Sequence, residues 1–478
     1  MKEDWIEVEL GNICNFIGGG TPSKKNSSYW NGNIPWASIK DLKGSTLVTT
    51  QDYISEDGLK NSSSNLAKAG EIIIGTRINP GRPIISKITT AINQDLKVVK
   101  PLVDIEIEFL FYAFKELEKD IVKLSSGTTV LGINLNNLKS IPFNLPPLPI
   151  QRAIVTKIEN LFTSLDKGIA DLKKAKEQLK SYRQAVLKKA FEGELTREWR
   201  EKNSTASSFE YLQELSKNRL TNKPDKSSIY YKKISHDFNF VKDDKIPTWS
   251  KGTLDKLVYI AARIGWRGLK KDEYTETGPL FLSVHSLNYG KNVDYSEAFH
   301  LSTERYEESP EIQLEEGDVL LCKDGAGIGK IGIVKNLPSK ATVNSSLLVI
   351  RGMQVLNQEF LYYLFSGPDL QKIVFERITG RATPHLFQND IRKFELMIPP
   401  IEEQYQIVRE IESRLSVCDK VEQSIIEALD KSEALRQSIL KKAFEGKILS
   451  EAEIAKCKQE ADYEPASVLL SNNKNKKP

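Results

Sequence analysis

The chain contains the same long segment twice. Residues 146–193 begin with two prolines and end in Lys-Lys-Ala-Phe-Glu-Gly, and residues 399–446 do the same. The offset is 399 − 146 = 253 at the start and 446 − 193 = 253 at the end, so the copies align without a gap, and about twenty of the 48 aligned positions are identical. Solenoid repeats are only about 20 to 50 residues long. The sequence therefore predicts a duplicated domain and pseudo-twofold symmetry.

Each copy carries a heptad pattern typical of a coiled coil. The seam positions lie seven residues apart, at Ile158, Leu165, Leu172, Leu179 and Val186 in the first copy and at Ile411, Cys418, Ile425, Ser432 and Ile439 in the second. Residues 150–200 are basic on balance and residues 401–450 slightly acidic, which favours pairing between the two helices. Twofold symmetry within one chain suggests that they pair antiparallel. Forty helical residues would make a rod of about 60 Å, with the globular parts at opposite ends.

The regions before each helix predict two mixed globules. In the first, short β-like runs at 71–74 and 96–99 are bounded by turn residues, and a helix is expected around Glu106 to Leu124. Residues 34–39 and 279–284 are loosely similar, which indicates that the globules are duplicated too. The predicted fold class is α+β, with two globular α/β domains separated by two long helices that form an antiparallel coiled coil.

The expected domain order follows from these patterns. It is a first globule at 1–148, a helix at 149–195, a linker at 196–246, a second globule at 247–400, a second helix at 401–449 and a tail at 450–478. The linker is polar and turn-rich, with one short helix expected around Phe209 to Leu220. The tail is polar and ends in a Lys/Asn-rich stretch, so we expect it to be disordered.

Composition limits the class of protein. A chain of 478 residues is too long for one core. The net charge of 68 − 64 = +4 permits nucleic-acid binding but is weaker than the basic excess of a stand-alone DNA-binding protein. There is no run of 18 apolar residues and no apolar signal region at the N-terminus, so we expect a cytoplasmic protein. The scattered cysteines argue against a disulfide framework and structural zinc; they are Cys14, Cys322, Cys418 and Cys457.

Three sequence patterns that could indicate phosphate binding, methyl transfer or metal binding are incomplete. A phosphate loop needs Gly five residues before Gly-Lys and Ser/Thr after it, but Asp324 and Ile331 occupy those positions around residues 325–330. We interpret this segment as a turn between strands. The Asn-Pro-Pro-aromatic motif of amino-methyltransferases is broken at residues 144–148 by Leu145 and by the missing aromatic residue. The histidines lack metal-ligand spacing; they are His236, His285, His300 and His385.

The whole arrangement resembles the specificity subunit of type I restriction–modification enzymes. The resemblance covers nearly the whole chain. Its motifs are Leu145-Pro146-Pro147-Leu148-Pro149-Ile150-Gln151, Arg183 to Leu187, Gly193 to Arg200, Ile398 to Gln404, Gln437 to Gly446, and Gly20-Thr21-Pro22-Ser23 followed by Ile34-Pro35-Trp36.

The resemblance implies a non-catalytic, DNA-binding subunit of a restriction system that also methylates DNA. In that family the two globules are target recognition domains, and each reads one half of an asymmetric bipartite site in double-stranded DNA. The helices set the spacing and dock two methyltransferase subunits, and restriction subunits then join. The family also implies that S-adenosylmethionine, ATP and Mg belong to the partner subunits. The sequence leaves open a coiled-coil protein-interaction scaffold without DNA readout; a methyltransferase acting alone is disfavoured by the missing motifs.

Candidate DNA contacts are basic or amide residues near turns. Arginine can donate two hydrogen bonds to guanine, and Asn or Gln can bond adenine, although a basic loop residue is more often only solvated. In the first globule the candidates are Lys24, Lys25, Arg77, Asn79, Arg82 and Lys87. In the second globule they are Arg263, Arg267, Lys270 and Lys271, which surround Trp266, together with Lys323, Lys330 and Arg381.

The repeated helix ends are candidate docking sites for the methyltransferase subunits. Lysines in a last helical turn can also serve only to complement the helix dipole, and that alternative stays open. The candidates are Lys188, Lys189, Phe191, Lys441, Lys442 and Phe444.

Overall fold

The computed structural model describes residues 4–127, 131–221, 239–263, 273–353, 355–378 and 385–474. The chain divides into two compact units, one made of 1–173 with 425–478 and the other of 174–424. Each of the two long helices contributes to both units. These helices are α5 (Leu148–Phe191) and α13 (Ile401–Phe444), both 44 residues long. Each unit therefore contains one globule, one half of its own helix and one half of the other.

The globule of the first unit contains two main sheets and a strand pair. The larger sheet has the order β2-β10-β7-β8-β4, with β2 at Cys14–Gly18, β10 at Leu96–Pro101, β7 at Ile72–Gly75, β8 at Pro83–Ser86 and β4 at Thr46–Leu47. The smaller has the order β5-β3-β9-β6, with β5 at Asp52–Ile54, β3 at Ile34–Ala37, β9 at Thr90–Ile92 and β6 at Asn65–Ala67. The pair is β1 (Ile6–Glu9) with β11 (Pro142–Leu145). The helices are α1 (Leu10–Ile13), α2 (Glu56–Lys60), α3 (Ile107–Lys123) and α4 (Leu135–Lys139), with 3-10 turns η1 (Ser27–Trp30) and η2 (Ile39–Asp41).

The globule of the second unit repeats this plan. Its sheets have the orders β14-β20-β17-β18, β16-β15-β19 and β12-β13-β21. The strands are β12 (Val241–Lys242), β13 (Ser250–Thr253), β14 (Tyr259–Ala261), β15 (Tyr274–Leu282), β16 (Phe299–Leu301), β17 (Val319–Cys322), β18 (Ile331–Ile333), β19 (Ala341–Val343), β20 (Leu347–Arg351) and β21 (Glu395–Ile398). The helices are α6 (Arg197–Lys202), α7 (Ser208–Thr221), α9 (Thr303–Glu307), α10 (Gln358–Ser366), α11 (Pro368–Ile378) and α12 (Gln388–Arg392), with 3-10 turns η3 (Leu254–Lys256), η5 (Val284–Leu287), η6 (Pro310–Ile312) and η7 (Gly325–Gly327).

The pairing of the strands confirms that the globules are duplicated. Strand β3 pairs parallel with β9 in the first globule, and β15 pairs parallel with β19 in the second. The antiparallel hairpin β7–β8 corresponds to β17–β18. Helix α3 confirms the helix that the sequence predicts from Glu106 to Leu124, whereas the second globule divides the equivalent helix into α10 and α11 at Gly367 and Pro368.

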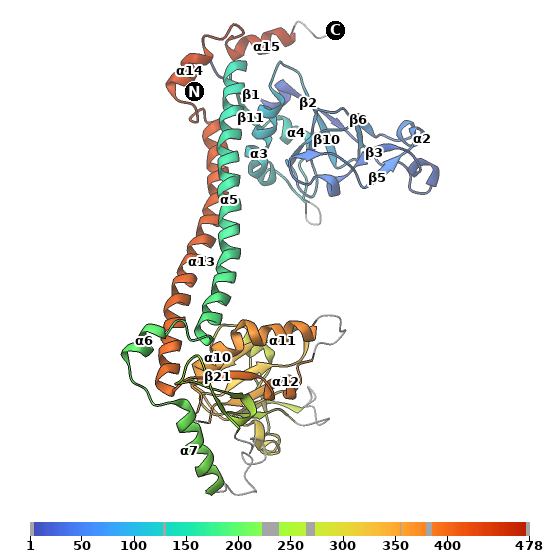
Figure 1. The fold of residues 1–478 in the computed structure, drawn as a ribbon. Coiled ribbons are helices and arrows are strands. Elements are labelled where there is room, and N and C mark those ends of the chain that lie inside the picture. Colours follow the sequence, from blue (N-terminus) through green and yellow to red (C-terminus); the bar gives the residue numbers. More distant parts are fainter. Residues whose placement is uncertain are drawn as a thin grey trace. The chain divides into compact units, whose positions relative to one another are not determined.

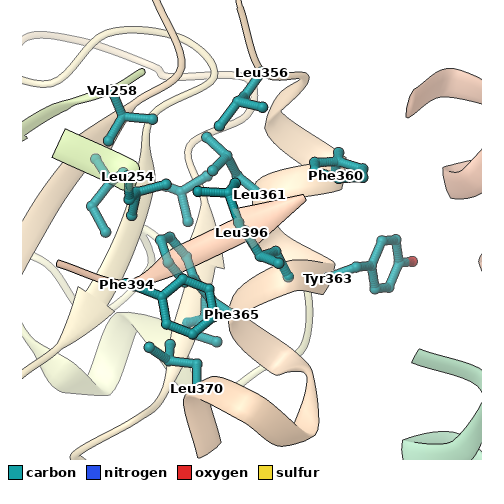
Figure 2. Close-up of a cluster of buried hydrophobic side chains, with 14 of the residues drawn as sticks. Leu254, Val258, Leu356, Phe360, Leu361, Tyr363, Phe365, Leu370, Phe394 and Leu396 are labelled. Atoms are coloured by element: carbon teal, nitrogen blue, oxygen red, sulfur yellow. The ribbon is translucent and has the colours of Figure 1, made fainter. Parts of the chain in front are cut away.

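The hydrophobic core of the second globule forms around its last strand. Figure 2 shows Leu361 and Phe365 of α10 gathered with Leu396 of β21 and Leu254 of η3. All four side chains are buried. This apolar cluster continues to α13 through Ile407, so the core anchors the start of the long helix to the globule.

The long helices pair antiparallel within each unit. In the first unit the N-terminal part of α5 lies beside the C-terminal part of α13 (Figure 1), and Arg436 forms an ion pair with Asp166. In the second unit the halves are exchanged, and Arg183 Nη2 lies 2.7 Å from Asp419 Oδ1 and 3.1 Å from Glu422 Oε2. The basic side chains of α5 thus meet acidic side chains of α13 in that unit, as the charge bias predicts.

The heptad seam and the helix ends agree with the sequence pattern. The seam positions with the deepest burial are Ile158, Val186, Ile411, Cys418, Ile425 and Ile439. Each helix is followed two residues later by a glycine in the left-handed region, Gly193 with φ 76° and Gly446 with φ 70°. A residue without Cβ adopts this conformation at little cost and ends a helix. The predicted fold class is confirmed.

A buried glutamine explains why the Pro-Pro motif is repeated. The Gln151 side chain accepts a hydrogen bond from the Glu106 N–H at 2.9 Å and donates one to the Pro146 carbonyl at 2.9 Å. Glu106 directly precedes α3. The same amide therefore holds the start of the globule's helix and the turn that leads into α5.

The second copy repeats this clamp. The Gln404 side chain accepts from the Asn357 N–H at 2.8 Å and donates to the carbonyls of Pro399 at 3.0 Å and Val355 at 3.1 Å. Asn357 directly precedes α10. Both glutamines are buried, so their hydrogen-bonding groups must be satisfied within the protein.

The segment expected to be a linker is part of the second unit where it is described. Glu403 is fully buried on α13 and accepts hydrogen bonds from Thr196 Oγ1 and Trp249 Nε1, both at 2.7 Å. Arg200 completes the site as an ion pair with the same carboxylate. A buried carboxylate is tolerated when its lone pairs are satisfied in this way. Helix α7 confirms the short helix predicted around Phe209 to Leu220.

The prediction of a disordered tail at 450–478 is wrong for most of that segment. Helices α14 (Glu451–Cys457) and α15 (Ala466–Lys474) follow α13. Cys457, Ala466 and Leu469 are buried in the core of the first unit. Judging the tail by its polar composition overlooked these few apolar residues, which are sufficient to attach it.

Ion pairs also hold the tail. Arg152 Nη2 lies 2.8 Å from Glu460 Oε2 and 2.9 Å from Asp462 Oδ2, and Lys157 Nζ lies 2.9 Å from Glu453 Oε1. Hydrogen bonds from the Ser450 backbone, and then from Lys157, lower the pKa of Glu453 to about 2. Glu453 is therefore ionised and available to Lys157 at neutral pH.

Replacing either clamp glutamine should weaken the fold. Gln151→Ala and Gln404→Ala each leave buried backbone groups without their partner, which costs about 1 to 3 kcal/mol per site. We expect a lower melting temperature for each variant by differential scanning calorimetry. Gln184→Ala, at an exposed position of α5, is the matched control and should melt like the wild type. Equal melting of all four proteins would show that the clamps contribute nothing.

Candidate nucleic-acid interface

Each globule presents a hairpin turn in the same setting. The turn between β7 and β8 covers residues 76–82, and the turn between β17 and β18 covers 323–330. In the first globule Arg77 forms an isolated antiparallel bridge with Gly132, and in the second Asp324 forms one with His385. The bridged positions 132 and 385 differ by the repeat offset of 253, so the two turns are equivalent.

A second turn in each globule is held against a neighbouring strand by matching backbone hydrogen bonds. The Asn93 N–H donates to the Ala37 carbonyl at 3.0 Å, and the Asn344 N–H donates to the Leu282 carbonyl at 2.9 Å. These bonds link the turn after β9 or β19 to the end of β3 or β15. Each globule therefore holds its turn against the neighbouring strand in the same way.

The two turns of each globule are also bonded to each other. The Thr76 N–H donates to the Asp95 carbonyl at 2.8 Å, and the Lys323 N–H donates to the Ser346 carbonyl at 2.8 Å. We call these two turns, together with the backbone hydrogen bonds that join them, the two-turn framework. Its side chains differ between the copies: Arg77, Gln94 and Asp95 in the first correspond to Asp324, Ser345 and Ser346 in the second. Equivalent backbones thus display different chemistry.

A cavity of about 960 Å³ lies at the framework of the first globule. Its lining combines amides, hydroxyls, lysines and carboxylates with exposed apolar groups, which is the mixture that can contact phosphates and base edges. The lining residues are Thr21, Lys24, Ser27, Trp30, Asn31, Trp36, Ser38, Ile39, Lys40, Asp52, Ile78, Asn93, Gln94 and Asp95.

The wall of this cavity that carries Lys24 is held by hydrogen bonds to the Gly20 carbonyl. The Gly20 carbonyl accepts hydrogen bonds from Trp36 Nε1 at 3.1 Å and from Ser64 Oγ at 2.6 Å. A Cβ at Gly20 would lie 2.3 Å from Ser63 Oγ, so the close approach requires glycine. This accounts for the glycine of the Gly-Thr-Pro-Ser motif.

Ile78 is held in a strained conformation beside this cavity. Its φ is 68°, in the left-handed region, which is unusual for a β-branched residue. The side chain is 51% exposed, and the N–H donates to the Leu131 carbonyl at 2.8 Å. Strain of this kind concentrates at functional sites, where the surrounding structure maintains it.

The first globule brings together most of its predicted contact residues. Arg77 and Asn79 lie exposed in the hairpin turn, with Lys24 on the cavity wall and Lys25 exposed next to it. Two residues depart from this group. Arg82 is only half-exposed at the end of the turn, and Lys87 follows β8 at the end of the hairpin opposite the turn.

The predicted contact residues of the second globule differ in how exposed they are. Lys330 is exposed, and its Nζ donates to Asn288 Oδ1 at 2.5 Å. Lys323 is 13% exposed and forms an ion pair with Asp324, so little of it is available to DNA. Four further candidates lie outside the described residues, namely Arg267, Lys270, Lys271 and Arg381.

The prediction of Arg263 as a surface contact is wrong in this structure. Only 7% of the residue is exposed, and its guanidinium lies over the Phe281 ring at 5.8 Å. Burial lowers its pKa, and the nearby Arg305 lowers it further. Its place at the end of a strand signal, β14, could have indicated burial.

Sequence reasoning missed Gln94, Asp95 and His385. Gln94 and Asp95 follow the apolar strand β9 in an Asn-Gln-Asp turn, which is the same kind of signal that pointed to Asn79. His385 forms an ion pair with Asp324 when it is protonated, but it is far from Asp324 in the sequence. No local pattern could have joined those two residues.

The phenylalanines at the helix ends face their own units. The Phe191 ring meets Phe360 at 5.2 Å between centroids, and the Phe444 ring meets Phe109 at 5.1 Å. Both are half-buried, so packing within the chain already occupies much of their surface. The lysines beside them are exposed and remain candidates for docking; they are Lys188, Lys189, Lys441 and Lys442.

Two kinds of site are not found in the part of the chain that the structure describes. No group of three His, Cys, Asp or Glu residues there could hold a metal ion. None of the helices described is both long and apolar enough to cross a membrane.

Known proteins share this sequence and architecture. A family model described as the type I restriction modification DNA specificity domain matches residues 2–178 and 269–431. The specificity subunit of the type I restriction enzyme EcoBI from Escherichia coli is 24% identical over 456 residues, covering 94% of this chain and 88% of that one. The specificity subunit of MjaVIII from Methanocaldococcus jannaschii is 22% identical over 425 residues, covering 86% of each.

Solved structures share the fold. The crystal structure of the HsdS subunit from Thermoanaerobacter tengcongensis matches with a TM-score of 0.54 at 18% identity, covering 94% of this chain and 98% of that chain. A chain from a structure that describes complex assembly and conformational transition of the type I R-M system matches with a TM-score of 0.62 at 18% identity, covering 93% and 98%. Duplicated α/β domains with paired long helices thus define a specificity-subunit fold.

Since the family model matches more than half of the residues, the chain belongs to the type I restriction–modification DNA specificity subunit family. It is the DNA specificity subunit of such a system and is itself non-catalytic. The resemblance drawn from the repeated Pro-Pro helices is confirmed.

Ile78→Gly should stabilise the protein. The change removes about 1 to 2 kcal/mol of left-handed strain and adds about 0.5 to 1 kcal/mol of chain-entropy cost. We therefore expect the free energy of unfolding to rise by up to about 1.5 kcal/mol, as measured by urea denaturation. Ile78→Ala keeps the Cβ and so the strain, and should give no gain. A less stable glycine variant would show that φ at this position is not strained.

Proposed function

We propose that each globule reads one half of an asymmetric bipartite site in double-stranded DNA through its two-turn framework. The observation that carries this proposal is that two equivalent backbones display different side chains. Equivalent backbones would approach DNA in the same way, and different side chains would select different bases. The two half-sites should therefore differ, and the whole site should not be palindromic.

The same duplication supports two identical partners. We infer that two methyltransferase subunits dock at the repeated helix ends, where Lys188 and Lys441 are exposed at equivalent positions. One turn later in each copy there is a glutamate. Lys188 Nζ lies 3.8 Å from Glu192 Oε1, and Lys441 Nζ lies 3.8 Å from Glu445 Oε1. Restriction subunits would then join the complex. S-adenosylmethionine, ATP and Mg would be bound by these partners in the cytoplasm.

Methylation mapping tests this function directly. The chain is expressed with its methyltransferase subunits in a host without other adenine methylation, and modified adenines are mapped by single-molecule sequencing. We expect one bipartite motif whose halves differ. A coiled-coil scaffold without DNA readout would give no motif, and a motif of one uninterrupted half would also overturn the proposal. Methyl transfer by the purified chain alone would contradict its non-catalytic role.

The isolated chain should bind DNA weakly because its net charge is only +4 and because partners would supply many phosphate contacts.

In the complex, we expect Lys24→Ala with Lys25→Ala to weaken binding to all duplexes about equally. The slope of log K against log salt should fall by up to about 2, since each phosphate contact contributes about 0.9. Fluorescence anisotropy at several salt concentrations measures this slope.

Lys68→Ala with Lys119→Ala is the matched control for this experiment. Both lysines are exposed on the first globule but do not line the cavity. This pair should leave the slope nearly unchanged. A control pair that lowers the slope as much as Lys24 with Lys25 would indicate a diffuse charge effect rather than a contact at the cavity.

A further inference from the structure

We propose that Arg77 reads a guanine and Gln94 reads an adenine in the half-site of the first globule, and that Asp95 positions both side chains. This inference rests on the proposed function and assigns specificity to named residues. It predicts part of the recognised sequence from the arrangement of hydrogen bonds around one carboxylate.

Asp95 is fixed by its surroundings. Its backbone carbonyl accepts from the Thr76 N–H at 2.8 Å, and its own N–H donates to Asn93 Oδ1 at 3.1 Å. Its carboxylate also accepts from Asn93 Nδ2 at 3.2 Å, and only 16% of its side chain is exposed. The carboxylate is therefore a rigid anchor rather than a mobile surface group.

Two exposed side chains meet this anchor. Arg77 Nη1 lies 3.5 Å from Asp95 Oδ1, and Gln94 Nε2 lies 3.3 Å from Asp95 Oδ2. Each carboxylate oxygen thus faces one of the two. Side chains held in place before binding lose less entropy when they meet DNA, which favours specific readout.

The geometry leaves Arg77 able to recognise guanine. Its side chain is 59% exposed, and the ion pair engages Nη1. A guanidinium has five N–H donors, so it can donate to guanine O6 and N7 while Asp95 retains one edge. The carboxylate also offsets part of the positive charge, so Arg77 is less suited to being a general phosphate contact.

Gln94 is oriented at both ends of its amide. Its Oε1 accepts a hydrogen bond from Thr21 Oγ1, and its Nε2 donates to Asp95. These two bonds determine which end of the amide carries the nitrogen. One N–H and one oxygen lone pair remain, and they match the N7 acceptor and N6 donor of adenine.

The corresponding framework positions of the second globule cannot read the same pair in this way. Asp324, Ser345 and Ser346 occupy the corresponding positions, and none of them has a guanidinium or a long amide. The predicted guanine and adenine therefore belong to one half-site only. Because a single carboxylate holds both readers, we infer that these two base pairs lie within a few steps of each other.

The experiment maps methylated adenines for complexes containing the wild type, Arg77→Ala, Gln94→Ala and Asp95→Asn. We expect Arg77→Ala to relax the motif at one G·C pair and Gln94→Ala to relax it at one A·T pair of the same half. Methylation of sites with the wrong base should rise about 5- to 150-fold relative to the correct base. Asp95→Asn should relax both positions, an effect that a purely structural role would not produce when the melting temperature is unchanged.

Lys119→Ala is the control from the same globule, at an exposed position of α3 outside the cavity, and should leave every position of the motif unchanged. The proposal is overturned if Arg77→Ala and Gln94→Ala recognise the wild-type motif with full stringency. It is also overturned if the wild-type half-site affected lacks a guanine or an adenine. These outcomes are distinct from failure of the proposed function, in which the wild-type complex has no bipartite motif.

A variant that folds but no longer methylates is still informative. Its complex is then tested by competition binding, with duplexes altered one base pair at a time, beside the conservative variants Arg77→Lys and Gln94→Asn. We expect each variant to lose preference at the single base pair assigned to its residue. A wild-type preference at every base pair would overturn the assignment.

Discussion

The hydrogen bonds of two buried glutamines join each globule to its long helix in this chain. Gln151 and Gln404 each bind the start of a globular helix and the proline turn that opens a long helix. Without them, buried backbone groups would lack partners where each globule leads into its long helix. The Pro-Pro-x-x-x-Gln spacing is therefore a constraint on geometry, which explains why it occurs twice while the surrounding globular sequence has diverged.

The two copies are not interchangeable at the residue before the glutamine. Position 403 carries a buried glutamate that binds Thr196, Trp249 and Arg200, whereas the equivalent position 150 carries isoleucine. Breaking a buried ionic site by removing one partner is strongly destabilising. The segment after α5 thus became bound to the second unit, while the first unit uses apolar packing and the tail helices for the corresponding region.

The sequence predicted the parts of the fold that depend on periodicity. The heptad at Ile158 and Ile411 and the helix from Glu106 to Leu124 required only local patterns. The tail helices were missed because their stability comes from a few contacts with a distant part of the chain, such as the Ala466 N–H to the Asp4 carbonyl. The candidate contacts divided in the same way: the exposed turn position of Arg77 follows from local sequence, whereas the burial of Arg263 depends on tertiary packing.

The two-turn framework has an evolutionary consequence. Its bonds run between backbone groups, as from Thr76 to Asp95 and from Lys323 to Ser346, so they do not depend on which side chains stand at the turns. Substitutions on exposed turn positions usually change stability by only about 0.5 kcal/mol. New sequence preferences are then accessible through single mutations that the fold tolerates, and each globule can diversify independently while the helices keep their seam and their glutamine clamps.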